Sequence, residues 1–331
     1  MTLTELRYLI ALARERHFGR AAAACFVSQP TLSVAIRRLE EELGATLFER
    51  RNNDIRLTPL GATLTERAQR VLNEAAALKE AAKQGKDPLS GPLRMGAIFT
   101  VGPYLLPQLT IRLRKLAPRM PLLIQENYTA RLADLLTQGD LDAIIVALPF
   151  RLAGTVMAPL YEEPFVVAVP SAHPLAAQKT VTSAQLQREA PLMLGSGHCL
   201  RDQILEQLPA LNRAPQGEME ARQWEGSSLE TLRHMVASGS GISVFPSTAV
   251  PAEHARGRSG GALVSYVPFS PPVPRREVVL VWRDSYSRPR AIEVLREAIA
   301  SCDLPGARLQ APHPSRPPGA ASSNRKKLLR K

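Results

Sequence analysis

Cys199 is the residue of this 331-residue sequence that is most clearly placed to do chemistry. It follows the turn-forming run 195–197 and comes directly before a segment with a helical pattern, residues 200–207. A thiol at the start of a helix meets the positive end of the helix dipole and free backbone N–H groups, which stabilise thiolate. A thiolate attacks peroxide and becomes sulfenic acid, in a reversible step. The alternative is that Cys199 is a small buried apolar side chain, as most isolated cysteines are.

Several neighbouring or cationic side chains are candidates for tuning this thiol, because a nearby cation favours the ionised form. They are His198, Arg201, Asp202, Arg233 and Arg276. Arg233 and Arg276 come from distant segments, so only the fold can bring them to Cys199. We assign no catalytic role to His198, because a histidine beside a turn is as often a polar neighbour.

The other two cysteines, Cys25 and Cys302, are far from Cys199 and from each other in the sequence. An odd number of widely separated cysteines does not suit a disulfide scaffold, and no Cys/His spacing suits zinc. The sequence shows no catalytic triad and no glycine-rich phosphate loop. We therefore expect no metal, no cofactor and no enzymatic activity.

Length and charge set wide bounds on the function. The hydrophobic content of 45% is enough for two domain cores, and no apolar run approaches the roughly 20 residues of a membrane helix. The first residues lack a signal-peptide pattern, so we expect a cytoplasmic protein with reduced thiols and no membrane contact. The net charge of +12 does not establish DNA binding, because residues 1–90 hold 14 Lys and Arg against 11 Asp and Glu, whereas residues 303–331 hold 7 against 1.

The N-terminal part has the pattern of a winged helix-turn-helix. Helical spacing predicts a first helix over residues 6–13, and an alanine-rich second helix follows over residues 19–25. Ser28 has the position of an N-cap for a third helix, which Gly44 ends. Residues 47–57 predict a short β-hairpin, the wing.

The polar face of the third helix suits the major groove of DNA. Small polar residues at its start can approach base edges, the arginines after them can reach bases or phosphates, and arginines in the wing can hold the adjacent backbone. The predicted DNA-contacting residues are Gln29, Pro30, Thr31, Ser33, Arg37, Arg38, Arg50 and Arg51. A solvated face on an ordinary helical bundle is the alternative, but it does not explain why the capped helix, the hairpin and a dimerisation helix occur together.

A long helix after the wing carries a seam with a period of 3.5 residues, which is typical of packing against another helix. The seam residues are Leu64, Ala68, Val71, Ala75 and Leu78. Because a lone helix of this length has too little to bury its seam against, we expect a homodimer. Beyond a hinge at residues 85–92, short apolar runs alternate with helical stretches, which predicts an α/β effector domain of mainly parallel strands with two subdomains and a cleft.

We therefore predict an all-α winged helix-turn-helix with a dimerisation helix, followed by an α/β effector domain. The predicted parts are a DNA-binding domain (1–58), a dimerisation helix (59–87), an effector domain (88–302) and a disordered basic tail (303–331).

Residues 1–62 resemble the DNA-binding domain of LysR-type transcription regulators. The resemblance is carried by Phe18-Gly19-Arg20-Ala21-Ala22, Ser28-Gln29-Pro30-Thr31-Leu32-Ser33, Ile36-Arg37-Arg38-Leu39-Glu40, Leu47-Phe48-Glu49-Arg50 and Leu57-Thr58-Pro59-Leu60-Gly61. It implies an effector domain like the periplasmic binding proteins, double-stranded promoter or operator DNA as a partner, and assembly into homodimers or homotetramers. It also implies a place at the bacterial nucleoid and makes RNA polymerase a further candidate partner.

The effector half resembles the hydrogen-peroxide-responsive regulators of that family. The specific signature is the run Gly197-His198-Cys199-Leu200-Arg201-Asp202-Gln203, with support from residues 100–107 and 228–233. This resemblance implies that Cys199 senses peroxide to regulate oxidative-stress genes as activator or repressor. It also implies that the hydroxyls of Thr100 and Thr129 line the peroxide pocket.

Leu208 departs from that pattern. In those regulators a second cysteine nine residues after the reactive one closes a disulfide, and here this position is Leu208. Gln223 likewise stands where the pattern has a histidine. We expect oxidation of Cys199 to stop at sulfenic acid, or to give a mixed disulfide with a small thiol or another chain. The alternative is a LysR-type regulator that responds to a small-molecule ligand in the effector cleft, with Cys199 not redox-active.

Overall fold

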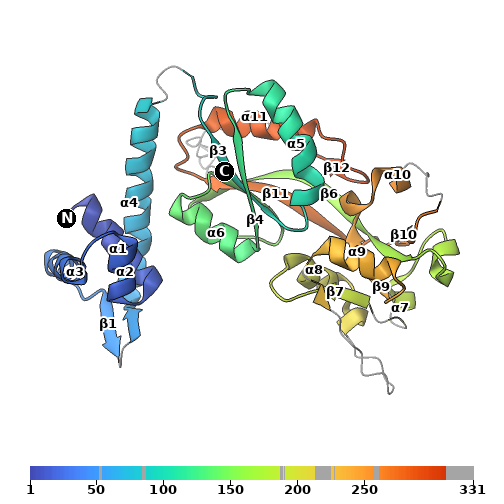
Figure 1. Ribbon diagram of the computed structural model, residues 1–331, viewed down its shortest axis with the longest axis horizontal. Helices are drawn as coiled ribbons and strands as arrows, with labels where there is room; N and C mark the ends of the chain where they lie inside the picture. Colours follow the sequence, from blue (N-terminus) through green and yellow to red (C-terminus); the bar gives the residue numbers. More distant parts are fainter. Residues whose placement is uncertain are drawn as a thin grey trace, which may run out of the picture.

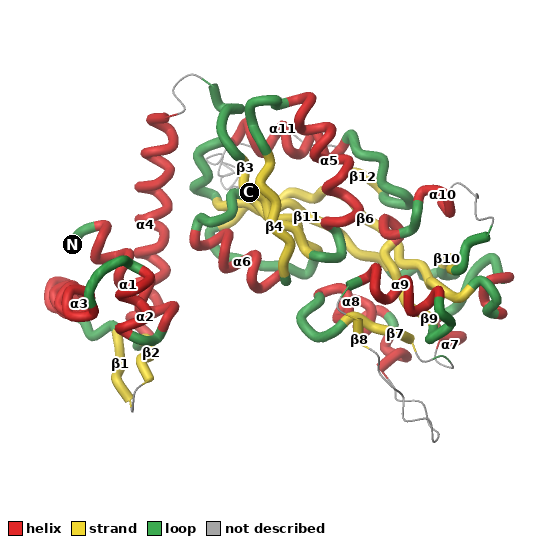
Figure 2. Tube along the Cα trace, in the orientation of Figure 1, coloured by secondary structure: helices red, strands yellow, loops and turns green. Residues whose placement is uncertain are grey.

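The computed structural model describes residues 1–51, 54–83, 87–186, 189, 191–212, 225–226, 228–255 and 261–310. The N-terminal helices, the wing and the long helix α4 stand beside a larger α/β domain (Figures 1 and 2). None of the helices in these ranges is both long and apolar enough to cross a membrane.

The N-terminal unit is the predicted winged helix-turn-helix. Its elements are α1 (Leu3–Glu15), α2 (Phe18–Ala24), α3 (Gln29–Leu43), β1 (Phe48–Arg51) and β2 (Asp54–Leu57). The hydroxyl of Ser28 accepts a hydrogen bond from the backbone N–H of Thr31, and Gly44 adopts φ +62° after the last turn, so both predicted ends of the third helix are confirmed. The wing is an antiparallel hairpin, as predicted. Leu9, Leu12, Leu32 and Leu39 are fully buried and form the centre of this small core.

Helix α4 (Pro59–Lys83) begins directly after the wing. Leu64 and Ala68 pack against the core of the winged helix, so the first positions of the predicted seam are already covered within the chain. Val71 and Leu78 are 44% and 75% exposed, and Ala75 is half-buried. The part of the seam that remains open to another helix therefore starts at Val71.

The α/β domain contains one mixed sheet with the strand order β4-β3-β5-β11-β6-β9-β7-β8, to which β10 and β12 add by pairing with β6. Its strands are β3 (Leu93–Ile98), β4 (Leu122–Asn127), β5 (Ala143–Ala147), β6 (Thr155–Pro170), β7 (Pro191–Leu194), β8 (Glu225–Gly226), β9 (Ile242–Pro246), β10 (Val264–Pro268), β11 (Arg275–Arg283) and β12 (Arg308–Leu309). Its helices are α5 (Gly102–Leu116), α6 (Thr129–Gln138), α7 (Ser183–Leu186), α8 (Cys199–Gln207), α9 (Leu229–Ala237), α10 (Ala252–Ala255) and α11 (Pro289–Ala300), with short 3-10 turns at Pro174–Ala177, Pro209–Asn212 and Ser247–Ala249.

Two hydrophobic cores divide this domain into the two predicted subdomains. The first is built around β3, β5 and β11 with α5, α6 and α11, and the second around β7 and β9 with α8 and α9. Strand β6 belongs to both, because Tyr161 is buried in the first core and Phe165 in the second. In Figure 1, β6 and β11 run from one subdomain toward the other.

The expectation of mainly parallel strands is wrong for the middle of the sheet. β3 pairs in parallel with β4 and β5, and β7 with β8 and β9, but β11 runs antiparallel to β5 and β6, and β6 antiparallel to β9, β10 and β12. Parallel neighbours require a crossover, usually a helix. Strand β11 instead follows β10 of the other subdomain and inserts between β5 and β6, so that it runs opposite to both of them.

The prediction that disorder begins at residue 303 is wrong for residues 303–310. Leu304 is 6% exposed in the first core, and β12 pairs with β6. The backbone N–H of Gln310 donates to the carbonyl of Leu160 over 2.8 Å. The burial of Leu304 and the main-chain pairing of β12 order these residues, although their local composition favours disorder. Residues 311–331, the rest of the predicted tail, lie outside the described residues.

Candidate thiol site and nucleic-acid interface

Cys199 is the first residue of α8 and lies where the two subdomains meet. Its half-buried side chain packs against the first core, whereas the next residue, Leu200, is fully buried in the second. Gly197, at φ +95°, makes the turn into the helix, a backbone conformation that favours glycine. The prediction of a cysteine at a helix N-terminus is confirmed. A chemical change at its sulfur would alter the packing of both subdomains.

Arg276 brings a buried positive charge to this place. Its guanidinium donates to Oγ1 of Thr100 over 2.8 Å and to the carbonyl oxygen of Thr100 over 2.9 Å. Burial opposes its charge, but the Glu163 carboxylate foremost, together with Tyr161 and the sulfur of Cys199, raises the pKa of Arg276. Arg276, one of the cations predicted to tune the thiol, therefore interacts electrostatically with Cys199, and its hydrogen bonds place Thr100 beside it.

Glu163 is a site residue that the sequence analysis missed. Its side chain and that of Arg276 are both 0% exposed, and Nε of Arg276 donates to Oε1 of Glu163 over 2.8 Å. The other carboxylate oxygen accepts from the backbone N–H of Thr248 over 3.1 Å and from its hydroxyl over 2.6 Å. Glu163 lies on β6 between the residues of the two cores, opposite Arg276 on β11. An acidic pair inside the otherwise apolar run 158–169 was the available signal.

An aromatic cluster surrounds the turn before Cys199. The ring of His198 is 4.9 Å from the ring of Tyr128 and 5.9 Å from that of Phe99, measured between centroids. Thr129 follows Tyr128 at the start of α6, and its buried Oγ1 has no hydrogen-bond partner among the described residues. Its hydroxyl therefore keeps the capacity to bind a small polar molecule.

The remaining predicted tuning residues point to other tasks. The guanidinium of Arg201 donates to the carbonyl of Leu194 over 3.0 Å, and Asp202 is exposed on the first turn of α8. The guanidinium of Arg233 contacts Glu230, the hydroxyl of Tyr266 and the carbonyl oxygen of Ala249. Arg233, Glu230 and Ala249 line a cavity of about 810 Å³ together with Tyr104, and Cys199 does not line this cavity.

No other cysteine is placed to resolve an oxidised Cys199 within the described part of the chain. Leu208 ends α8 and is 3% exposed in the second core. Cys302 is 3% exposed, its Sγ donates to the carbonyl of Ala298 over 3.4 Å, and burial raises the pKa of its thiol. Burial likewise raises the pKa of Cys25, in the winged helix.

The recognition face of α3 is open to solvent. Gln29, Pro30, Thr31, Arg37 and Arg38 are exposed and Ser33 is half-buried, on the side opposite Leu32, Ile36 and Leu39. Val34, 56% exposed on the same helix, was not among the predicted DNA contacts. The backbones of Arg50 and Arg51 lie in β1, but their side chains are outside the described part of the structure.

Comparisons with known proteins agree with both halves of this arrangement. Residues 3–62 match the bacterial regulatory helix-turn-helix protein, lysR family, and residues 86–302 match the LysR substrate binding domain. The chain is 43% identical over 299 residues to the DNA-binding transcriptional dual regulator OxyR of Escherichia coli, covering 90% of this chain and 95% of that protein. It is 40% identical over 284 residues to the hydrogen peroxide-inducible genes activator of Haemophilus influenzae, covering 86% and 91%.

Solved structures of OxyR share the fold. A Cys-to-Asp variant of full-length OxyR from Pseudomonas aeruginosa has a TM-score of 0.71 at 48% identity, covering 94% of this chain and 99% of that one. A cysteine variant of Corynebacterium glutamicum OxyR with hydrogen peroxide bound has a TM-score of 0.58 at 32% identity, covering 90% and 91%. The chain belongs to the LysR family of bacterial helix-turn-helix transcription regulators, in which it is similar to the OxyR proteins.

Proposed function

We propose that this protein senses hydrogen peroxide by oxidation of Cys199 and thereby changes how it binds promoter DNA. The observation that carries the proposal is the position of Cys199 at the start of α8, between the two subdomains and within the field of the buried Arg276. The OxyR relatives, one of them solved with peroxide bound, support the choice of oxidant.

The reaction needs no cofactor. The Cys199 thiolate attacks one oxygen of hydrogen peroxide, a sulfur–oxygen bond forms, and the O–O bond breaks. The leaving hydroxide takes a proton and becomes water, so that the sulfur is oxidised by two electrons to sulfenic acid and the peroxide is reduced. The guanidinium of Arg276 interacts electrostatically with the sulfur of Cys199, and the hydroxyl of Thr129, which has no partner among the described residues, suits an oxidant or the leaving oxygen.

The absence of a cysteine at position 208 determines which oxidation product Cys199 can form. With Leu208 buried at the far end of α8, the sulfenic acid persists or reacts with a small thiol or a second chain. Either product adds a polar group where Cys199 packs against the first core. That addition repacks the start of α8 and strains the junction around Arg276 and Glu163, through which β6 connects the two subdomains.

The DNA-binding half supplies the output. The exposed face of α3 fits the major groove, and the exposed seam from Val71 to Leu78 suits a second copy of the chain. In a dimer or tetramer, a change in the effector domains re-spaces two recognition helices and with them the length of operator that is covered. Contact with RNA polymerase at the promoter would turn this change into activation, at the bacterial nucleoid.

Footprinting of an operator with reduced and peroxide-treated full-length protein tests both halves together. We expect the protected DNA region to change after peroxide treatment of the wild type. In Cys199→Ser, the protected region should stay the same as that of the reduced wild type. Dimedone labelling and mass spectrometry should find sulfenic acid at Cys199 with no intramolecular disulfide.

The buried Leu208 favours one second candidate, a regulator that responds to a ligand in the effector cleft with an inert Cys199. In that case Cys199→Ser and the wild type give the same footprints with and without peroxide, and no adduct forms at modest peroxide. This result would exclude the sensing role while leaving DNA binding intact.

A further inference from the structure

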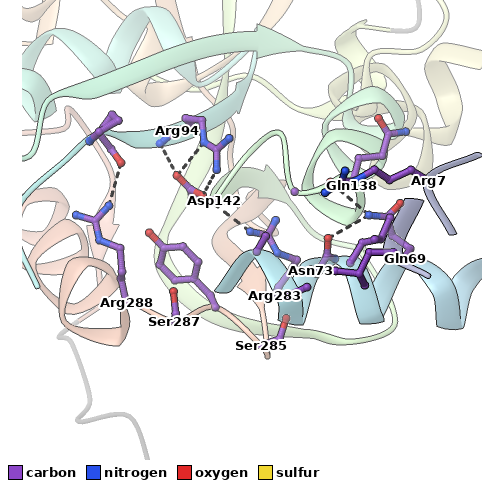
Figure 3. A pocket seen from close by; sticks show the side chains of 17 residues that line it. Arg7, Gln69, Asn73, Arg94, Gln138, Asp142, Arg283, Ser285, Ser287 and Arg288 are labelled. Atoms are coloured by element: carbon purple, nitrogen blue, oxygen red, sulfur yellow. Dashed lines mark hydrogen bonds and ion pairs between the residues drawn. The ribbon is translucent and has the colours of Figure 1, made fainter. Parts of the chain in front are cut away.

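A second pocket, of about 740 Å³, lies between the DNA-binding half and the effector domain, and no member of the Cys199 group lines it (Figure 3). Arg7 of α1 and Gln69 and Asn73 of α4 form one wall. Arg94 of β3 and Arg283 of β11 lie in the opposite wall. A ligand in this pocket would therefore touch both functional halves of the protein.

The two halves meet beside the pocket through a few amide contacts. Nδ2 of Asn73 donates to the carbonyl of Thr137 over 3.0 Å, and Nε2 of Gln69 donates to the carbonyl of Gln138 over 3.4 Å. Both acceptors belong to the last turn of α6. Helix α4 is thus joined to the effector domain at its edge by neutral groups, with an open space next to the joint.

The pocket has more positive than negative charge. Among the described residues that line it, four are arginines, Arg7, Arg94, Arg283 and Arg288, and one, Asp142, carries a carboxylate. That carboxylate, 7% exposed, accepts from the Arg94 guanidinium over 3.0 Å and from the Arg94 backbone N–H over 2.8 Å. Arg288 is used structurally, because it donates to the carbonyl oxygens of Pro88, Ser90, Gly91 and Pro92.

Arg283 is a largely buried cation with a distant countercharge. Its side chain is 12% exposed, and the nearest oxygen of Asp142 lies 3.9 Å away. Its Nη1 donates to the carbonyl oxygens of Leu136 and Leu141. Burial foremost, together with the charge of Arg94, lowers the pKa of Arg283 despite the attraction of Asp142. A buried cation without a full countercharge is costly, so an anion in the pocket would stabilise the folded chain.

The other lining groups indicate the kind of anion. Leu72 and the ring of Tyr286 give apolar surface, and the buried hydroxyl of Tyr286 has no hydrogen-bond partner among the described residues. Guanidinium groups bind carboxylate and phosphate through paired hydrogen bonds. The volume is in the range of sites for small organic molecules, larger than a lone phosphate requires.

We propose that this pocket binds a small organic anion with two or more carboxylate or phosphate groups, held between Arg7 on one side and Arg94 and Arg283 on the other. Such a ligand joins α1 and α4 to the effector domain and fixes the orientation of the DNA-binding half. The ligand needs no chemistry at Cys199 in order to bind, because none of its ligating groups belongs to the thiol site.

Isothermal titration calorimetry of the reduced full-length protein tests the site, with citrate and inorganic phosphate as probes at constant ionic strength. We expect both to bind one site per chain, citrate more tightly because it bridges both walls. Arg7→Gln should weaken citrate binding about tenfold, the loss of one charge-assisted hydrogen bond. Arg114→Gln, on the exposed face of α5, removes the same charge outside the pocket and should leave the affinity unchanged.

A second variant supplies the anion within the chain. Ser287 is exposed at the pocket, so Ser287→Glu should fold normally, abolish citrate binding and raise the Tm in the absence of any anion. Ser240→Glu, at an exposed site elsewhere, should do neither. The proposal is overturned if neither citrate nor phosphate binds the wild type. A second copy of the chain that fills the pocket would give this result. It is also overturned if Arg7→Gln and Ser287→Glu bind citrate as the wild type does. Neither result bears on peroxide sensing.

Discussion

Replacing Glu163 by glutamine should destabilise the effector domain far more than the same change at its neighbour Glu162. Glu163→Gln keeps the size of the side chain but removes the countercharge of Arg276, at a site where both side chains are 0% exposed. Breaking a buried pair from one side costs about 3–5 kcal/mol, because the other charge stays buried. For a domain of this size that corresponds to a fall in Tm of about 6–20 °C.

Glu162→Gln is a matched control on the same strand. Glu162 accepts from Arg275 over 2.7 Å, a distance close to that of the buried pair, but these side chains are 38% and 55% exposed. Solvent screening limits an exposed pair to about 1 kcal/mol or less, so this variant should lose only a few degrees. The two ion pairs thus have nearly the same N–O distance but differ in burial.

Urea unfolding of the reduced protein, followed by circular dichroism and by tryptophan fluorescence, measures both variants. A double variant, Glu163→Leu with Arg276→Met, should recover much of the lost stability, because apolar side chains of similar volume often replace a buried pair without loss. Equal losses for Glu163→Gln and Glu162→Gln would refute the reasoning from burial. After addition of hydrogen peroxide, the double variant should also form sulfenic acid at Cys199 more slowly, as followed by dimedone labelling, since the cation beside the thiol is gone.

Three further changes test other parts of the structure. Gly61→Ala places a Cβ about 2.1 Å from the backbone oxygen of Leu47, so the start of α4 must move away from the wing. We expect the free energy of unfolding to fall by about 1–3 kcal/mol and operator binding to weaken in a gel-shift assay. Unchanged binding would contradict the close approach. Cys302 should resist iodoacetamide in the native protein at neutral pH, because it is 3% exposed and burial raises its pKa, and peptide mapping that finds rapid labelling would show that the end of α11 opens. Val71→Asp should dissociate the dimer in analytical ultracentrifugation, whereas Thr63→Asp, exposed and off the seam, should not; equal behaviour of the two would place the dimer contact elsewhere.

The elements that the sequence predicted well are those whose causes are local. Ser28 caps α3 through its own hydroxyl, and Gly44 ends it with its own backbone, so a few neighbouring residues determine both ends. The start of α8 at Cys199 is set in the same way by the turn at Gly197. No distant contact is needed for any of these features.

The features that were missed depend on pairing between distant segments. Strand β6 shows only its apolar second half as a local pattern, and its antiparallel partners come from far along the chain. The choice between Arg233 and Arg276 as neighbour of Cys199 is of the same kind, since both are single arginines near strands or helices of the second half. Only the register that puts Glu163 opposite Arg276 decides it.

Strand β11 links the two proposed control points, because Arg276 lies near its first residue and Arg283 is its last. Seven residues of strand separate them by roughly 23 Å, and the strand is paired on both sides with β5 and β6. If oxidation of Cys199 shifts the balance between two orientations of the DNA-binding half, and an anion at Arg283 favours one of them, the two events must be coupled. Linkage then requires that oxidation change the citrate Kd by the same factor by which citrate changes the equilibrium between reduced and oxidised thiol. A citrate Kd that is identical for both redox forms would mean that the pocket and the thiol act on separate equilibria, even though one strand carries both.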